Sequence, residues 1–314
     1  MKIFVAGATG VLGRRLTRRF QDRGITVVGL VRNENGAHIV RTQGGYPVYA
    51  DIFDADALAR CAEGCDVIIH AATSIPVKTK PKAADWAMND RLRREGTQAL
   101  TACAAHVGAR TYIQQSVIWV ARPSNGAFFD EESPVQPDPV SRSAYDSEVI
   151  ARAAGEKHGF NVSVLRCGWF YGPDAAHTRF LADGLQKRRL PIIGSGEALW
   201  SCLHLDDAAG AFVTAAEASL RGVWHIVDDH PVRVADFIRY FASRLNAPTP
   251  MHIPTWLARW VAGAYAVNFF TQTVRTSNAR FRSATGWTPK YPSYREGIDQ
   301  IVETWSNEAQ SRVT

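Results

Sequence analysis

The chain has 314 residues, enough to bury a large core in one or two closely joined domains. Hydrophobic residues make up 46% of the sequence and charged residues 21%, proportions that exclude a disordered or fibrous chain. The net charge of +6 comes mostly from scattered arginines, including short clusters at residues 14–19 and 91–94, with no interleaved aromatic residues. We therefore expect a globular protein with a solvated basic surface and no nucleic-acid partner.

The cysteines indicate whether the protein has a metal site and in which compartment it lies, and the most apolar segment indicates whether it crosses a membrane. The five cysteines form no CxxC pair and no cluster with histidines, which predicts reduced thiols and no metal site. The N-terminus lacks the positive and apolar regions of a signal peptide. Residues 254–270 are apolar but too short to span a bilayer, and they contain Arg259. We expect a cytoplasmic protein without a membrane partner.

The predicted elements alternate along the first half of the chain. Short apolar runs predict strands at residues 2–6, 26–31, 46–50, 66–70, 111–115 and 161–166. Helical periodicity predicts helices at residues 11–23, 55–62, 84–106 and 144–158. This alternation indicates an α/β fold with a doubly wound parallel sheet of the Rossmann type.

The second half is less regular. We expect a helix at 178–187, a strand at 200–204, a helix at 206–218 and a strand at 223–227, followed mostly by helices. Residues 1–172 would form the dinucleotide-binding domain, completed by about 200–228, while 173–199 and 229–314 would form a smaller, mostly helical substrate-binding region. The connection between residues 120 and 144 is long and rich in Pro, Ser and Asp, which is typical of a functional or a disordered loop.

A glycine motif follows the first strand directly and opens the first helix. Gly7, Gly10 and Gly13 stand three residues apart. Glycines let the backbone turn sharply and approach a pyrophosphate, whose charge then meets the N–H groups at the helix start. We expect residues Gly7, Thr9, Gly10, Val11, Leu12 and Gly13 to bind a dinucleotide. A tight turn without a ligand is the alternative.

The end of the second strand bears on which dinucleotide is bound. Arg32 stands where a carboxylate would accept from the adenosine ribose, and Arg14 follows the third glycine. A guanidinium suits a 2′-phosphate, so the sequence favours NADP(H), with NAD(H) as the alternative. If Arg32 is only solvated, it makes no contact with the cofactor. Asp51 either accepts from the adenine amino group or caps the next helix.

Several segments together resemble the extended short-chain dehydrogenase/reductases of the NAD-dependent epimerase/dehydratase type. The matching segments cover nearly the whole chain: GATGVLG at 7–13, Asp51-Ile52, His70-Ala71-Ala72, Glu95-Gly96-Thr97, Ser116, Tyr171-Gly172-Pro173, His204-Leu205-Asp206-Asp207 and Gly286-Trp287-Thr288-Pro289. The resemblance implies that Asp51, Ile52, Ala71 and Ala72 join the glycine loop in the cofactor site.

In that family a Ser or Thr positions the substrate oxygen, a Tyr transfers the proton, and a Lys four residues later assists the Tyr. Carried over, Ser116 and Tyr145 are the predicted catalytic pair, but Val149 occupies the Lys position and Arg93 replaces the Asn three residues before Gly96. Keeping an unassisted tyrosine ionised at pH 7 costs about 4 kcal/mol. We therefore expect an atypical branch in which Tyr145 acts as a neutral donor, or else is an ordinary tyrosine at a helix start.

The other candidates are mainly aromatic. Tyr171, after the sixth strand, is expected to line the crevice, and Trp119 and Trp169 to form apolar pocket walls. His204 is expected to be structural. Trp256 and Trp260, four residues apart, favour a core or subunit-interface position over a substrate lid.

Three functions remain open on this basis. The first is an NAD(P)H-dependent oxidoreductase that reduces a carbonyl or related electrophile on a small, largely apolar molecule. The second is an epimerase or dehydratase with tightly held cofactor, and the third is a cofactor-binding sensor or partner-binding protein without turnover. The oligomeric state would be a monomer or homodimer.

Overall fold

The computed structural model of the protein describes residues 1–78 and 80–311. Its centre is a seven-stranded sheet in which every neighbouring pair is parallel, in the order β11-β6-β5-β4-β1-β2-β3. The strands are β1 (Lys2–Ala6), β2 (Thr26–Val31), β3 (Tyr46–Tyr49), β4 (Val67–His70), β5 (Thr111–Val117), β6 (Asn161–Cys167) and β11 (Gly222–Ile226). This confirms the doubly wound Rossmann fold.

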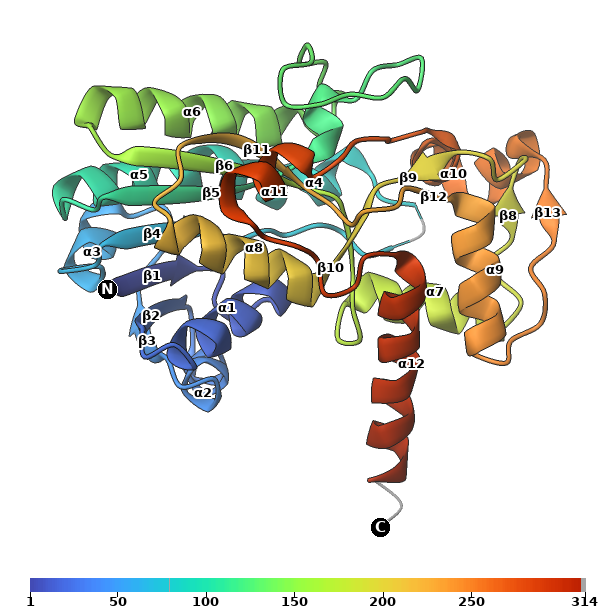
Figure 1. The fold of residues 1–314 in the computed structure, drawn as a ribbon, viewed down its shortest axis with the longest axis horizontal. Coiled ribbons are helices and arrows are strands. Elements are labelled where there is room, and N and C mark those ends of the chain that lie inside the picture. Colours follow the sequence, from blue (N-terminus) through green and yellow to red (C-terminus); the bar gives the residue numbers. More distant parts are fainter. Residues whose placement is uncertain (79, 312–314) are drawn as a thin grey trace.

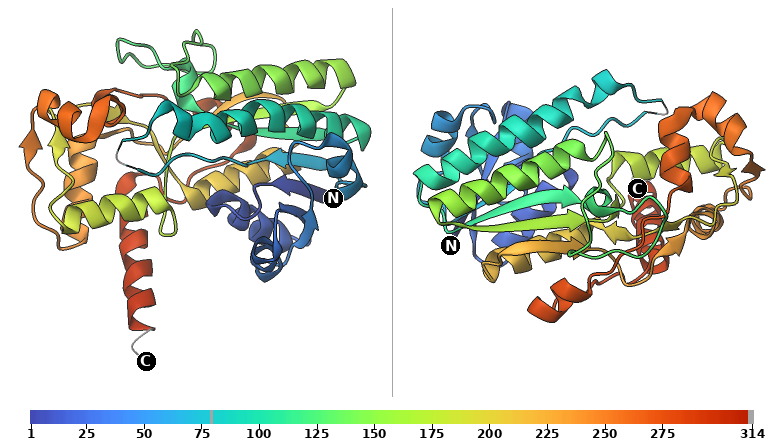
Figure 2. Two further views of the ribbon diagram at one scale, coloured as in Figure 1. Left: turned by 180° about the vertical axis from the view of Figure 1, so that it is seen from behind. Right: turned by 90° about the horizontal axis from the view of Figure 1, so that it is seen from above.

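Helices cover both faces of the sheet (Figures 1 and 2). One face packs against α1 (Val11–Gln21), α2 (Glu34–Thr42), α8 (Leu205–Glu217) and α11 (Ala279–Thr285). The opposite face packs against α3 (Ala55–Cys61), α5 (Thr97–His106) and α6 (Arg142–His158). Because the strand order reverses between β1 and β4, a crevice opens at the carboxyl ends of these strands, where ligands of such folds bind.

A smaller region lies beyond that carboxyl edge (Figure 1). Its helices are α7 (Ala176–Gln186), α9 (Val234–Arg244), α10 (Thr255–Thr271) and α12 (Tyr294–Gln310). Three two-stranded ladders connect it: β7 (Trp169–Tyr171) with β10 (Cys202–His204), β9 (Leu199–Trp200) with β12 (Val232–Arg233), and β8 (Ile192–Ile193) with β13 (His252–Ile253). A separate aromatic core holds these elements together, so the region has a hydrophobic core of its own.

The helix expected at residues 84–106 is interrupted. It consists of α4 (Ala83–Arg91), a π-helical turn η1 (Leu92–Gly96) and α5. The side chain of His70 contacts the carbonyl of Leu92 at 3.1 Å, and the Thr97 hydroxyl donates to the carbonyl of Arg93, so both carbonyls find partners within the altered turn. Short π-helical insertions of this kind are frequent at functional sites.

Two further differences concern helices. Helix α2 was not predicted because its periodic segment, residues 34–42, is short and contains a glycine. Helix α10 is kinked at Gly263, whose φ of 84° and ψ of 169° are not helical. None of the helices within residues 1–78 and 80–311 is long and apolar enough to cross a membrane. The last three residues of the predicted substrate-binding region lie outside the described residues.

Candidate cofactor and substrate cleft

A large cleft runs along the carboxyl edge of the sheet from the glycine loop to helix α10. It encloses about 2140 Å³, compared with roughly 300–1,000 Å³ for a typical small-ligand pocket. One end is lined by the loop after β1 and by the ends of β2, β3 and β4, and the other by residues 138–141 and α10. The cleft is therefore large enough for a dinucleotide and a second molecule.

The glycine loop is built by close backbone contacts. Gly7 has a φ of +91°, and a Cβ atom there would lie 2.6 Å from the backbone of Ala71 and Ala72. A Cβ on Gly13 would lie 2.1 Å from the carbonyl oxygen of Gly7. Helix α1 begins after Gly10 without a side-chain cap, so its first N–H groups remain available to an anion. These residues fit a pyrophosphate.

The predicted cofactor residues have two different placements. All but one line the cleft, and these are Gly7, Thr9, Gly10, Val11, Leu12, Arg32, Asp51, Ile52, Ala71 and Ala72. Gly13 instead packs helix α1 against the loop. Asp51 does not cap α3, because Asp54 does so by accepting from the N–H of Ala57 at 3.0 Å.

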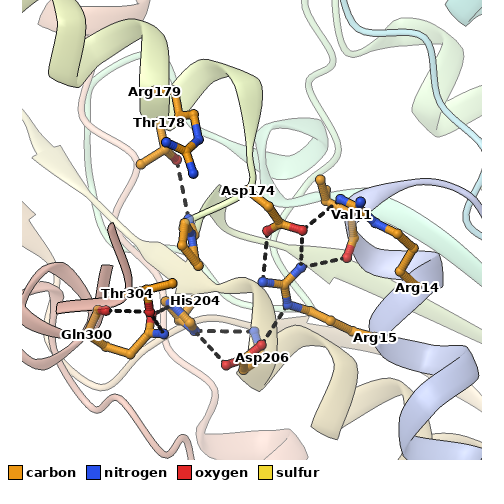
Figure 3. A network of polar contacts seen from close by, with 12 residues as sticks. Val11, Arg14, Arg15, Asp174, Thr178, Arg179, His204, Asp206, Gln300 and Thr304 are labelled. Atoms are coloured by element: carbon orange, nitrogen blue, oxygen red, sulfur yellow. Dashed lines mark hydrogen bonds and ion pairs between the residues drawn. The ribbon is translucent and has the colours of Figure 1, made fainter. Parts of the chain in front are cut away.

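The two arginines considered for a 2′-phosphate differ. Arg32 is exposed at the cleft and forms no ion pair with any residue in the described part of the chain. Arg14 is paired with Asp174 through a 2.7 Å contact from Nη2 (Figure 3). Arg32 is therefore the better placed of the two for a ligand phosphate.

A polar network behind the glycine loop connects distant parts of the chain (Figure 3). Arg15 on α1 donates from Nε to Asp206 at 2.6 Å and pairs through Nη2 with Asp174 at 2.8 Å. His204 caps α8 by accepting from the N–H of Asp206, and its Nε2 lies 3.1 Å from Oε1 of Gln300 on α12. Burial lowers the pKa of His204 to about 4, so this histidine is neutral and structural.

The predicted catalytic pair is not placed along the cleft. Ser116 on β5 is 1% exposed and donates to Glu148 on α6, which also accepts two hydrogen bonds from Arg166 at 2.9 and 2.7 Å. Neither Ser116 nor Tyr145 is among the described residues that line the cleft. On the same helix, Val149 is 42% exposed and Tyr145 is half-buried, whereas Glu148 is fully buried.

Tyr171 also lies elsewhere than expected. It is fully buried in the core of the smaller region, with its ring near His204 and Phe237. A Cβ on Gly297 of α12 would lie 2.3 Å from the Tyr171 hydroxyl oxygen, so this helix packs directly on the tyrosine. Trp119 and Trp169, by contrast, lie in the cleft wall.

Arg93, Arg122 and Tyr265 are among the residues of the cleft that were not selected from the sequence. Arg93 belongs to a cluster interpreted above as solvated, but only 5% of it is exposed. It shares the spacing of three or four residues that joins the buried Trp86, Asn89 and Thr97, and this pattern could have identified it. Burial raises the pKa of Tyr265 to about 12, so its phenol is protonated at neutral pH.

Only part of the long loop between residues 120 and 144 reaches the cleft. Arg122 and residues 138–141 line it. The intervening segment packs against other loops, with Phe129 donating its N–H to the carbonyl of Arg275 and Glu131 accepting from the N–H of His225.

Known proteins resemble this chain in sequence and fold. A model of the NAD dependent epimerase/dehydratase family matches residues 3–226. The 3-diazoavenalumate denitrifying reductase of a Streptomyces species is 33% identical over 309 residues, which cover 95% of this chain and 99% of that protein. The 4-hydroxy-2-methyl-3-oxo-4-farnesyl-3,4-dihydroquinoline-1-oxide ketoreductase of Stigmatella aurantiaca is 29% identical, and the match covers 76% of this chain and 71% of that protein.

Solved structures confirm the fold. The human epimerase family protein SDR39U1, crystallised with NADPH, superposes with a TM-score of 0.82 at 22% identity, covering 96% of this chain and 99% of that one. Streptomyces venezuelae DesIV, a dTDP-glucose 4,6-dehydratase crystallised with NAD, gives a TM-score of 0.79 at 22% identity, with 99% and 98% covered.

Proposed function

Because this chain belongs to the NAD dependent epimerase/dehydratase family, we propose that it is an NADPH-dependent reductase of a small aromatic molecule. The observation that carries the proposal is the continuous cleft, which joins a pyrophosphate-binding loop to a wall of aromatic side chains. The glycine loop would hold the pyrophosphate and Arg32 the 2′-phosphate. Trp119, Trp169 and Phe269 would orient the substrate ring and exclude water.

The positions of the Ser116 and Tyr145 hydroxyl groups indicate which type of electrophile the cleft could reduce. When bound, the reduced nicotinamide would supply a hydride, and an arenediazonium ion plus a hydride gives the arene and N₂ without any proton. A ketone plus a hydride gives an alkoxide, which must take up a proton. Since Ser116 and Tyr145 do not line the cleft, we favour a diazo group as the electrophile, as in the name of the denitrifying reductase.

Reduction of a carbonyl is the second candidate, in line with the ketoreductase relative. Tyr265 is the observation in its favour, because it lines the cleft and its hydroxyl makes no hydrogen bond to any of the residues that the structure describes. A protonated phenol at this position would donate to a substrate oxygen.

One pair of assays tests the function and separates the two candidates. NADPH oxidation would be followed with 4-hydroxybenzenediazonium and with 4-hydroxybenzaldehyde, and N₂ release would be measured with the first. We expect the diazonium ion to be reduced above its uncatalysed rate, with one N₂ per NADPH, and Tyr265→Phe to leave that rate within about two-fold. If instead only the aldehyde is reduced, and Tyr265→Phe lowers that rate by roughly 100-fold or more, the carbonyl candidate holds. No turnover with either class would favour a cofactor-binding protein.

The cofactor preference has its own test. Losing a charge-assisted contact costs about 1.5–3 kcal/mol, so Arg32→Ala is expected to weaken NADPH binding by roughly 10- to 150-fold and NADH binding little. Equal NADPH affinity in both proteins, measured by fluorescence titration, would contradict the assignment. The cytoplasmic location and the monomeric or homodimeric state remain predictions.

A further inference from the structure

Arg93 is an unusual cation for the interior of this protein. It lies in the π-helical turn η1 and is 95% buried, yet no carboxylate of the described chain lies within 4 Å of its guanidinium. Its Nη1 makes two long contacts, to the carbonyl of Val140 at 3.4 Å and to the hydroxyl of Ser143 at 3.3 Å. Burying a charge this deeply is costly unless an anion compensates it.

The neighbouring arginines in the same cluster show what an ordinary cation looks like here. Arg91 pairs with Glu95 at 2.8 Å and Arg94 with Asp146 at 2.8 Å, and both remain about half exposed. Arg93 alone of the three is buried without such a pair, and it is one of the residues that line the cleft. Although burial lowers its pKa to about 10, Arg93 keeps its charge at neutral pH.

A second guanidinium approaches the same place. Arg122 lines the cleft with 11% of its side chain exposed, its Nε has no hydrogen-bond partner, and its Nη2 lies 3.9 Å from Asp138. The other oxygen of Asp138 is occupied, because it accepts from the N–H groups of Val140 and Ser141. Arg93 and Arg122 therefore both contact one turn, residues 138–141. The Asp138 carboxylate accepts hydrogen bonds within that turn and lies 3.9 Å from Arg122.

Flat aromatic rings lie beside these two cations. Trp119 and Phe269 have ring centroids 6.4 Å apart and an interplanar angle of 18°, and Phe269 and Tyr265 are 6.5 Å apart at 19°. All three line the cleft. Such near-parallel rings suit a planar ligand ring, and the planar fork of a guanidinium matches a carboxylate through two parallel hydrogen bonds.

We propose that Arg93, assisted by Arg122, binds the carboxylate of an aromatic acid substrate whose ring lies against Trp119, Tyr265 and Phe269. This inference rests on the proposed function, since it identifies the substrate class of the same cleft. Asp90 and Glu148 act on Arg93 only at longer range, so the acid would supply the directly contacting anion, and the ring would occupy the apolar end of the cleft. The carboxylate end of the substrate would thereby be fixed independently of its reacting group.

The test measures binding alone, so it does not depend on turnover. The protein saturated with NADP⁺ is titrated calorimetrically with 4-hydroxycinnamate, with its neutral amide, and with uridine diphosphate. We expect the acid to bind at least ten-fold more tightly than the amide, and Arg93→Met to remove that difference. Arg94→Met is the matched control, since Arg94 is adjacent but does not line the cleft, and it should leave all affinities within two-fold.

Two additional variants keep the result interpretable if Arg93→Met folds poorly. Arg93→Lys retains the charge without the planar fork and should recover part of the preference for the acid. Arg122→Met should lower the affinity for the acid by a smaller factor than Arg93→Met does. Any of three results would overturn the proposal. The wild type binds acid and amide equally, Arg93→Met binds the acid as well as the wild type does, or the protein binds uridine diphosphate through Arg93 and does not bind the acid. Arg93-dependent acid binding in a protein that reduces neither test substrate would support this site and contradict the proposed function.

Discussion

The buried group formed by Ser116, Glu148 and Arg166 is expected to determine stability and not turnover. Glu148 is 0% exposed and Arg166 3%, and Arg166 donates two hydrogen bonds to the Glu148 carboxylate. Glu148→Ala would leave the guanidinium of Arg166 buried without its anion. Breaking a buried pair in this way costs about 3–5 kcal/mol, a large part of the roughly 5–15 kcal/mol that stabilises a typical domain.

The expected loss can be measured by thermal unfolding. At about 2–3 °C per kcal/mol, Glu148→Ala should lower Tm by roughly 6–15 °C. Asp146→Ala is the matched control on the same helix, because its pairs with Arg94 and Arg142 are partly exposed and are worth about 1 kcal/mol or less. Ser116→Ala should fall between the two, since it removes one hydrogen bond to a charged group, worth about 1.5–3 kcal/mol.

Two results would refute this reasoning. Equal Tm values for Glu148→Ala and Asp146→Ala would show that the buried pair contributes no more than an exposed one. A Ser116→Ala protein of normal stability with turnover reduced 100-fold or more would return Ser116 to the catalytic role expected from the sequence. The double variant Glu148→Leu/Arg166→Met should recover much of the lost stability, because no charge is then left unpaired.

Two further predictions concern stability. Burial raises the pKa of Asp228, so the wild type should lose stability as the pH rises above the unfolded pKa near 4, by at most about 1.4 kcal/mol per pH unit, until the folded pKa is passed. In urea unfolding, the free energy of unfolding of Asp228→Asn relative to the wild type should therefore increase between pH 5 and pH 8. A relative free energy that stays constant over this range would contradict the prediction. Gly297→Ala should lower the free energy of unfolding by about 1–3 kcal/mol, because the added Cβ would lie 2.3 Å from the Tyr171 hydroxyl oxygen. The control Gly210→Ala, whose added Cβ has its nearest contact at 3.4 Å, should be neutral or stabilising. Equal changes in Tm for the two variants would argue against this packing.

Most of the residues predicted for the cofactor site line the cleft, and local geometry explains why the sequence could bring them together. The close backbone approaches at Gly7 and Gly13 tolerate no Cβ, so the glycine spacing itself reports the loop. Strand and helix alternation likewise predicted most of the elements along the chain and the parallel, doubly wound sheet, since periodicity reflects which face of each element is buried.

The substrate end was less predictable because it depends on contacts between distant segments. Tyr145 matches a catalytic tyrosine only by residue type and approximate position, whereas the packing of α6 turns Glu148 toward β5 and β6. The burial of Arg93 fits the helical spacing of its buried neighbours Asn89 and Thr97, but a periodicity of 3.6 residues does not predict the π-helical turn in which it lies. Tyr265 comes from α10, and its ring contacts Trp86 on α4, which is far away along the chain; nothing in its local sequence distinguishes it.

The network around Arg15 has a consequence for how the cofactor would be received. Arg15 joins α1 to Asp174 and Asp206, and His204 connects the same cluster to Gln300 on α12 (Figure 3). The start of α1 is thus braced by segments from three separate parts of the chain before any ligand arrives. When a ligand orders a flexible loop, part of the free energy of its contacts with the protein is used for that ordering. A loop that is already rigid avoids this cost, so the ligand binds more tightly. We therefore expect the glycine loop to be preorganised for its ligand.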